Sequence, residues 1–253
     1  MPDLLPLVLG LVALLYASVG HAGATGYIGV LSLVGVAADV IRPTALVLNV
    51  VVATIATVQF ARAGHLRTAL LGPLAAASVP CAFAAGAVSV PTAVLEGLLG
   101  FVLLASATRI VVDAARRGHG ETADTPQGDR APATVVLAVL GGLVGMLSGL
   151  TGVGGGVFLT PALLALHAAP VKTIAAVTAP FILVNSLAGL AGGLLAGRPL
   201  PVTASSWIAA AVVGGAAGSQ WGAFRLPVAA LRLLMAGVLA FASAKLLGRA
   251  WGL

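Results

Sequence analysis

Charged residues are scarce in this chain of 253 residues: they make up 8% of it, whereas 60% of the residues are hydrophobic. Soluble domains carry about 25% charged residues, so this composition excludes a soluble globular protein. Aromatic residues are also few, at 5%, and no basic cluster is interleaved with them. The net charge of +6 therefore does not indicate nucleic acid as a partner. The composition predicts an all-α polytopic membrane protein that lies in a lipid bilayer.

Cysteine is almost absent, since Cys81 is the single one. One thiol excludes an intramolecular disulfide and a cysteine-based metal site. The apolar runs also lack clustered Asp, Glu or His side chains, which disfavours a bound metal ion. We therefore expect no metal and no cofactor. No positive residue precedes the first apolar run, so we expect no cleaved signal peptide.

Long apolar runs dominate the rest of the chain, and a bilayer-spanning helix needs about 20 such residues. One polar segment, residues 113–132, separates two sets of four runs. We therefore predict about eight transmembrane helices in two homologous four-helix halves. Residues 1–112 form the first repeat, 113–132 a polar linker and 133–253 the second repeat. The runs are Leu4–Ala38, Pro43–Ala61, Thr68–Val88, Pro91–Val112, Ala133–His167, Pro170–Ala196, Pro201–Ala223 and Pro227–Leu247.

The first and fifth runs have about 35 residues each. As helices of 1.5 Å per residue they would extend for about 50 Å, whereas a bilayer core is about 30 Å thick. Each long run must therefore contain a bend, a half-helix or a re-entrant piece. Four crossings per half would make the repeats parallel, and a re-entrant first run would invert them.

The two halves repeat one another at the sequence level. Residues 91–109 match residues 227–245 at a constant offset of 136. Nearer the start the best offset is about 129. That offset pairs Gly23 with Gly152, Gly26 with Gly155, and Asn49 with Thr178.

Glycines interrupt the fifth run between Ser148 and Pro161, in a stretch without any charge. Glycine is about 1 kcal/mol worse than alanine inside a helix, so we expect the helix to break there. A break at membrane depth leaves backbone groups that need protein or a wet cavity around them, and transporters build substrate sites at such breaks. The alternative is close helix packing, because Gly141, Gly145 and Gly149 repeat every four residues. On this basis we expect Gly155→Val to abolish transport and Gly145→Ala to cost much less.

The Gly-x-Gly-Gly-Gly pattern at 152–156, followed by Pro161, resembles the TauE/SafE family of membrane transporters for sulfite and organosulfonates. A looser copy, Gly20-His-Ala-Gly-Ala-Thr-Gly-Tyr27, lies in the first half. The resemblance covers essentially the whole chain, and it implies a secondary carrier for a small sulfur-containing anion rather than an enzyme. The first half lacks the triple glycine, so equal contributions of backbone donors from both halves are not implied.

Anions suit this element, because N–H groups at the N-terminus of a half-helix offer donors and a partial positive charge. No Lys or Arg lies deep in the first, second, fifth or sixth run. Threonine hydroxyls could instead bond their own preceding turn, and the asparagines could serve to hold helices together. The predicted substrate-binding residues are Gly152, Gly154, Gly155, Gly156, Thr151, Gly23, Thr25, Gly26, Asn49, Thr178 and Asn185, with Thr160 as a further hydroxyl.

His21 is the one ionisable residue next to the first glycine element. It could carry a coupling proton, or it could be a neutral imidazole hydrogen-bonded across helices. Glu96 and Arg232 occupy equivalent positions in the two halves, where they could pair or extend to the lipid headgroups.

The rival functions are a carrier or channel for another small anion such as a carboxylate, a membrane scaffold, and an intramembrane hydrolase. The hydrolase would use Ser148 with His21 or His167, but the sequence offers no buried acid to orient either histidine. A homo-oligomer stays open. With eight crossings, nine cations, Arg198 among them, lie on the side of both termini, and four, Arg42 among them, lie at the other surface. We therefore expect the termini and the linker on the cytoplasmic side of the cell membrane.

Overall fold

The computed structural model describes residues 4–88, 132–198, 200 and 204–250, together with the single positions 104, 108 and 112. Every regular element within these residues is a helix. The linker between residues 113 and 131 lies outside them, so the division into two repeats with boundaries at 112 and 132 stays a prediction. Glu96 and the side chain of Arg232 also lie outside them. The helices are α1 (Leu5–Ser18), α2 (Ala24–Leu33), α3 (Ala38–Arg62), α4 (Thr68–Ala87), α6 (Thr134–Thr151), α7 (Gly156–Ala165), α8 (Val171–Leu195), α9 (Ser205–Gln220), the π-helical turn η3 (Trp221–Arg225) and α10 (Val228–Ala250).

Four of these helices are long and apolar enough to cross a membrane, judged by length and composition. They are residues 40–62 of α3 and the whole of α4, α6 and α8, and the apolar helices α1 and α7 are shorter. An α-helix pairs most of its backbone N–H and C=O groups within itself, which is the requirement that a bilayer imposes.

Each of the two 35-residue runs is divided into two helices that fold back on each other. The hydroxyl of Thr25 in α2 donates to the hydroxyl of Tyr16 in α1 at 2.9 Å, and Gly26 faces the side chain of Val12. In the second half, Gly155 faces Val144 and Ser148 of α6. We call residues 5–33 hairpin 1 and residues 134–165 hairpin 2. The break that the run length predicts is therefore a re-entrant turn in both halves.

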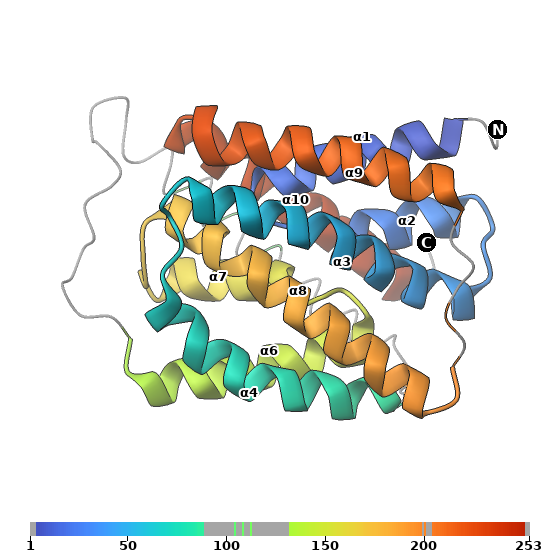
Figure 1. Cartoon of the computed structure of the whole chain (residues 1–253), viewed down its shortest axis with the longest axis horizontal. Helices are drawn as coiled ribbons and strands as arrows, with labels where there is room; N and C mark the ends of the chain where they lie inside the picture. Colours follow the sequence, from blue (N-terminus) through green and yellow to red (C-terminus); the bar gives the residue numbers. More distant parts are fainter. Residues whose placement is uncertain are drawn as a thin grey trace.

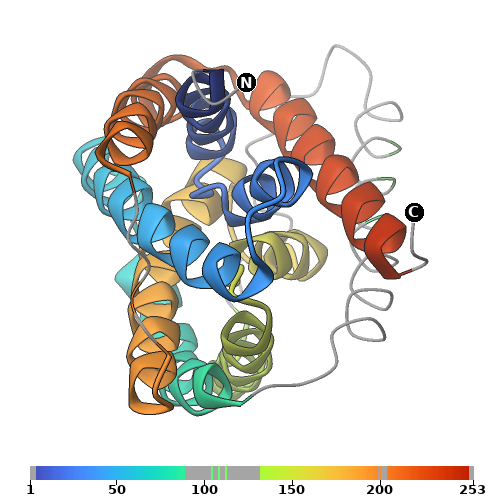
Figure 2. The same cartoon turned by 90° about the vertical axis from the view of Figure 1, so that its right-hand side faces the viewer.

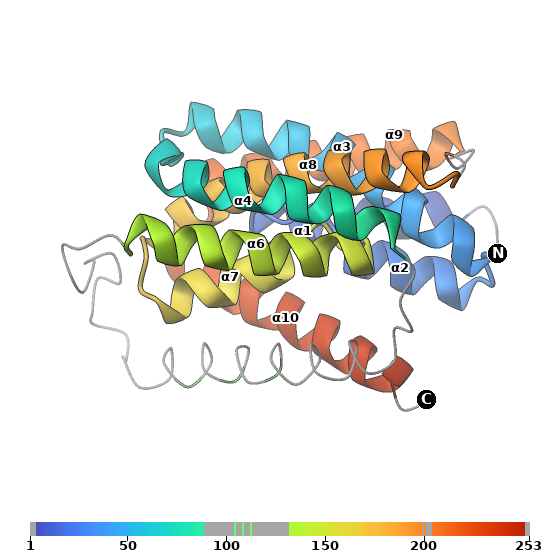
Figure 3. The same ribbon diagram turned by 90° about the horizontal axis from the view of Figure 1, so that it is seen from below.

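The helices form two layers, which are seen from the end in Figure 2 and from the side in Figure 3. One layer runs in the order α9, α3, α8, α4, and the two hairpins lie against it in the order α1, α2, α7, α6. Helix α10 lies outside the hairpin layer. The buried apolar core lies between the two layers and draws residues from both hairpins.

The described helices α1 to α3 and α6 to α8 follow each other in the same order and run in opposite directions. Helices α2 and α7 have 10 residues each, and α3 and α8 have 25 each. Counterparts run in opposite directions, since α1 and α6 start at opposite ends of the bundle (Figure 1). Contacts agree: Leu46 of α3 lies against Gly189 of α8, and Asn49 reaches the preceding turn at Ser186. Of the two arrangements left open by the sequence, the described helices agree with the inverted one.

The cation count placed both termini and the linker on the same side of the membrane. Leu5 and the end of α10 lie at one end of the bundle, and Thr134, which follows the linker, lies at the other (Figure 1). The expectation of eight crossings treated each long run as one crossing, whereas each hairpin returns towards the end from which it entered. It also put Arg42 and Arg198 on opposite sides, and the structure brings them to the same end.

Glycine ridges hold the hairpins against the other layer. A Cβ on Gly145 would overlap the carbonyl oxygen of Ser78 in α4, and one on Gly218 of α9 would overlap that of Leu14 in α1. The packing interpretation of this ridge is therefore correct. The comparison of Gly145→Ala with Gly155→Val stays a prediction, but a methyl group on Gly145 would meet the backbone of Ser78 rather than a movable side chain. The ridge residues are Gly141, Gly145 and Gly149 in α6, and Gly214, Gly218 and Gly222 in the α9–η3 segment.

Candidate functional site

The tips of the two hairpins require glycine. In hairpin 2, Gly152 ends α6 with φ 73°, and Gly155 precedes α7 with φ 83°. In hairpin 1, Gly20 and Gly23 have φ 78° and 105°. Left-handed backbone costs other residues about 1–2 kcal/mol, so these positions break the helices in the predicted places. Gly20 and Gly152 differ by 132 positions, as do Gly23 and Gly155, which replaces the offset of about 129 that the sequence comparison favoured.

The N–H groups at the start of α7 have no hydrogen-bond acceptor among the described residues. No hydrogen bond in the described part of the chain takes the N–H groups of Gly154, Gly155 or Gly156, and all three residues are buried. The same holds for Gly23 at the start of α2. Helix N-termini carry about half a positive charge, so two partial positive ends lie inside the bundle. Such ends are typical anion-binding positions.

Asn49 of α3 lies directly against the tip of hairpin 2. Its Nδ2 donates to the carbonyl oxygen of Val153 at 3.3 Å and to Oγ of Ser186 at 3.4 Å. A Cβ on Gly154 would lie 2.5 Å from the same nitrogen. Asn49 is 0% exposed, and its Oδ1 has no hydrogen-bond partner within the described residues. The predicted grouping of Asn49 with the glycine tip is therefore present in the structure.

A chain of polar side chains joins the two hairpins through their middle. Nε2 of His21 lies 3.3 Å from Oγ1 of Thr160 in α7, and that oxygen lies 3.2 Å from Oγ1 of Thr178 in α8. Nδ1 of His21 lies 3.3 Å from the carbonyl oxygen of Val19. The side chains of His21, Thr160 and Thr178 are all buried. The histidine thus takes the bridging arrangement that was one of its two interpretations.

Other predicted residues lie away from this centre. The hydroxyl of Thr151 donates to Leu147 of its own preceding turn at 2.7 Å, and Thr25 bonds within hairpin 1. Gly26 is inside α2 and faces Val12. Asn185 of α8 is buried, and its Nδ2 donates to Oγ of Ser78 at 3.0 Å and to its own helix, so it holds helices α8 and α4 together.

A family comparison decides which kind of protein has this site. Residues 5–246 match the model of the family described as "Sulfite exporter TauE/SafE". The chain belongs to the TauE/SafE family. A relative, the "Probable membrane transporter protein y4hK" of Sinorhizobium fredii (strain NBRC 101917 / NGR234), is 35% identical over 236 residues, which are 93% of this chain and 94% of that protein. No solved structure matches the chain.

The TauE/SafE assignment makes the protein a multi-pass membrane transporter, and it agrees with a small anion as substrate and a bilayer as surroundings. The resemblance drawn from the glycine pattern is thereby confirmed. In this TauE/SafE protein the rival hydrolase pair is not assembled: Oγ of Ser148 is buried without a partner among the described residues, and the ring nitrogens of His21 contact Val19 and Thr160 instead.

Sequence reasoning missed a cation at the site of this TauE/SafE chain. Arg42 lies in the second turn of α3, and its guanidinium donates to the carbonyl oxygen of Gly149 at the end of α6. A Cβ on Gly152 would meet the Arg42 side chain. Arg42 precedes the second run in the sequence, which did not indicate it for the site. The sequence placed the start of this run at Pro43. The helix α3 in fact begins at Ala38, so it includes Arg42.

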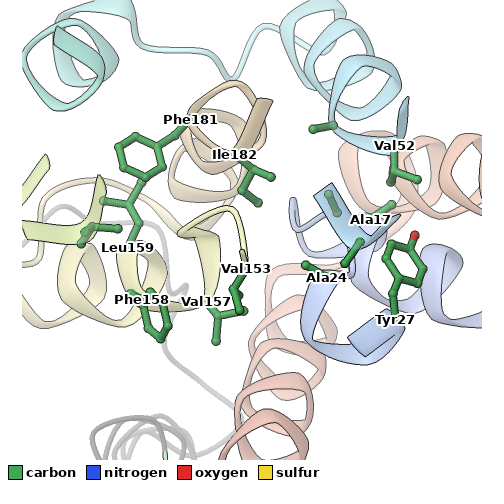
Figure 4. Close-up of a cluster of buried hydrophobic side chains, with 14 of the residues drawn as sticks. Ala17, Ala24, Tyr27, Val52, Val153, Val157, Phe158, Leu159, Phe181 and Ile182 are labelled. Carbon is green, nitrogen blue, oxygen red and sulfur yellow. The ribbon is translucent and has the colours of Figure 1, made fainter. Parts of the chain in front are cut away.

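Apolar side chains complete the contact between the hairpins. Figure 4 shows Val153 and Val157 of hairpin 2 in one group with Ile182 of α8 and Ala24 of hairpin 1. These residues belong to one buried cluster. The tips are thus packed on each other and closed to the outside in this conformation.

Proposed function

We propose that this TauE/SafE transporter is a secondary carrier that moves a small oxyanion of sulfur, sulfite or a short organosulfonate, by alternating access. The observation that carries the proposal is the set of buried N–H groups at Gly154, Gly155 and Gly156, at the start of α7 beside Asn49, for which the described residues show no acceptor. Each oxygen of a pyramidal or tetrahedral anion needs a donor, and a re-entrant tip presents several within one ligand diameter. The family description supports a sulfur-containing anion as the substrate.

The proposed binding set is centred on hairpin 2 and has a smaller part from hairpin 1. The amide of Asn49 and the hydroxyls of Thr160 and Thr178 would add donors to those of the backbone. Breaks of this kind near the middle of inverted repeats are the usual substrate sites of secondary transporters. The proposed substrate residues are Gly152, Gly154, Gly155, Gly156, Gly23, Asn49, Thr160 and Thr178, with His21 as the candidate for proton coupling.

Alternating access follows from the inverted architecture in this proposal. Each hairpin enters from a different end of the bundle, so moving one hairpin would open the centre to one side only. Both tips are buried here, and we assign this conformation to the occluded state between the two openings.

Flux measurements with purified protein in proteoliposomes test the substrate. We expect uptake of radiolabelled sulfite or taurine, competed by the other compound and not by phosphate or divalent metal ions. Flux of a metal ion without a sulfur anion would refute the proposal. Flux of acetate alone would keep the anion mechanism and replace the substrate with a carboxylate.

The orientation in the cell membrane is part of the proposal. Among the side chains that the structure describes, Arg62, Arg67, Lys172 and Arg225 lie towards the end that bears Thr134. Arg42 and Arg198 lie towards the end that bears the termini. Cytoplasmic loops carry the excess of Lys and Arg. We therefore place the linker in the cytoplasm and both termini outside, which keeps the sequence-based side for the linker and reverses it for the termini.

A further inference from the structure

The amide of Asn49 has one end that is bonded and one end that is not. Its Nδ2 donates to the carbonyl oxygen of Val153 and to Oγ of Ser186. The hydrogen bonds around an amide decide which end is oxygen. Turning this amide over would set its oxygen against the carbonyl oxygen of Val153, and neither atom can donate. The free end is therefore Oδ1, an acceptor that is buried without a partner among the described residues.

This acceptor lies at the tip of hairpin 2. Nδ2 of Asn49 would lie 2.5 Å from a Cβ on Gly154, and Oδ1 is bonded to the same carbon atom as Nδ2. Gly154 also begins the row of three buried N–H groups for which the described residues show no acceptor. Unpaired donors and one unpaired acceptor therefore lie within one amide group of each other.

Ser148 of α6 adds a second unpaired side chain next to the following residue of the tip. Its Cβ would lie 3.2 Å from a Cβ on Gly155. The side chain is 1% exposed, and its Oγ has no partner in the described part of the chain. A serine inside a helix can bond the carbonyl oxygen one turn earlier, as Ser219 does with Gly215 at 2.6 Å. Ser148 does not, although buried polar atoms nearly always have a partner.

The unpaired groups at the tip are of both kinds, which restricts the ligand that satisfies them. A bare anion accepts from the N–H groups and from a hydroxyl. It offers nothing to Oδ1 of Asn49, because two oxygen acceptors without a proton between them repel each other. An anion that also carries an O–H or N–H group satisfies every one of these atoms.

We infer that the tip of hairpin 2 takes a sulfur oxyanion that itself carries a hydrogen-bond donor. Oδ1 of Asn49 accepts from this donor, and the hydroxyl of Ser148 donates to the anion. The inference rests on the proposed anion transport and names the class of substrate that the same site prefers. Hydrogensulfite meets the requirement, as does a short sulfonate with a hydroxyl or ammonium group. The sulfite dianion and a plain alkanesulfonate do not.

Asn49 thus determines specificity through its oxygen. Both of its N–H groups have partners in this conformation, so the amide can donate to an anion only by giving up one of these bonds. Its Oδ1 has no such bond to give up. A site that pairs a buried group with a hydroxyl of the substrate rejects the analogue that lacks it.

Thermal unfolding of the purified full-length protein, titrated with isethionate and with propanesulfonate, tests the acceptor. The two sulfonates have the same length, and a methyl group replaces the hydroxyl in propanesulfonate. We expect wild type to need at least about tenfold more propanesulfonate for the same shift in Tm, which is about 1.4 kcal/mol of binding. Asn49→Leu should lose this preference. The control Thr54→Val, on an exposed face of the same helix, should keep it.

Ser148→Ala tests the hydroxyl. This variant removes a group that has no partner in the described part of the chain, so its Tm without anion should equal or exceed that of wild type. Both sulfonates should bind at least about tenfold more weakly, as expected for a lost hydrogen bond to a charged group. The control is Ser219→Ala, because that hydroxyl bonds its own helix, and it should titrate like wild type. A lower Tm with an unchanged titration in Ser148→Ala would assign the hydroxyl to packing.

The outcomes separate this inference from the proposed function. Equal potency of isethionate and propanesulfonate in wild type would overturn the inference, since a water molecule could then satisfy Oδ1, and sulfite flux would leave the proposed function standing. That comparison needs no variant, so it decides even if Asn49→Leu fails to fold. A preference that persists in folded Asn49→Leu, or no stabilisation of wild type by any anion, would also overturn it.

A carboxylate pair covers the case in which the protein moves no sulfur anion. Glycolate and propionate differ by the same exchange of a hydroxyl for a methyl group. If glycolate stabilises wild type at least about tenfold more potently, and Asn49→Leu removes the difference, the need for a donor is supported and the proposed sulfur substrate is refuted. Equal potency of this pair as well would refute the need for a donor in any anion.

Discussion

Nε2 of His21 lies 3.3 Å from Oγ1 of Thr160, although 139 positions separate the two residues in the sequence. The contact joins the tip of hairpin 1 to the first turns of α7 in hairpin 2, so it crosses between the two inverted repeats. Movement of one hairpin relative to the other must break or re-form it. Through this pair, a conformational change at one tip can therefore be transmitted to the other.

Replacing the hydroxyl of this pair should impair transport. Thr160→Val keeps the shape of the side chain and removes the partner of His21 and Thr178, and an unsatisfied buried polar group costs about 1–3 kcal/mol. We expect a fall in sulfite flux of about tenfold and a lower Tm. Thr151→Val is the control, because its hydroxyl bonds its own preceding turn. Equal flux in both variants would show that the bridge has no role in transport.

Asn49 should matter for both binding and stability. Asn49→Leu removes the donor to Val153 and leaves that carbonyl oxygen buried without a partner, at a cost of about 1–3 kcal/mol. We expect a raised KM for sulfite as well as a lower Tm. Thr54→Val, on an exposed face of the same helix, should change stability by less than about 0.5 kcal/mol and leave KM unaltered. A KM that does not move in Asn49→Leu would remove the asparagine from the substrate site.

The glycine ridge of α6 predicts a defect in folding rather than in substrate recognition. Gly145→Ala would push α6 away from the backbone of Ser78 in α4, and overpacking of this kind costs about 1–3 kcal/mol. Gly142→Ala in the same helix meets Cys81 at an ordinary 3.7 Å. Yield and Tm of monodisperse protein compare the two. The packing account fails if the two variants are equally stable, or if Gly145→Ala is the more stable one.

Cysteine accessibility checks the orientation. On a Cys81→Ser background, Leu4→Cys and Ala133→Cys place single thiols at exposed positions at the two ends of the bundle. We expect an impermeant thiol reagent to label Leu4→Cys in intact cells and to reach Ala133→Cys only after lysis. Labelling of Ala133→Cys alone would show that the molecule has the opposite orientation in the membrane. Protection of both would restore the arrangement expected from eight crossings.

The sequence predicts much of this fold because membrane helices and their breaks depend on local composition. The length of the first and fifth runs required a break, and the glycines of 152–155 located one correctly. The direction after the break depends on packing between hairpin and layer, which involves residues such as Tyr16 and Thr25 that carry no sequence signal for it. For that reason the sequence did not show that α1 and α6 begin at opposite ends of the bundle.

The candidate site was predictable in part for a similar reason. Glycine with positive φ is a local property, so the tip of hairpin 2 could be found from the sequence. Partners from distant helices could be named only by residue type: Asn49 reaches the tip, whereas Asn185 bonds Ser78 away from it. Arg42 was assigned to a membrane surface, because its approach to Gly149 depends on where α6 ends in three dimensions.

The role of the hairpin 2 tip is tested most directly by sulfite flux through Gly155→Ala in proteoliposomes, measured beside Gly189→Ala. Gly155 has φ 83°, and a Cβ on it would lie 3.0 Å from the ring of Phe181. A methyl group there would therefore change the backbone at the start of α7 and the positions of the N–H groups beside it. Gly189 is a buried α8 glycine whose Cβ would meet Leu46 at 3.7 Å. We predict that Gly155→Ala stays folded in the membrane with sulfite flux reduced at least about tenfold, and that Gly189→Ala transports like wild type. Equal flux through the two folded variants would contradict a substrate site at the glycine tip.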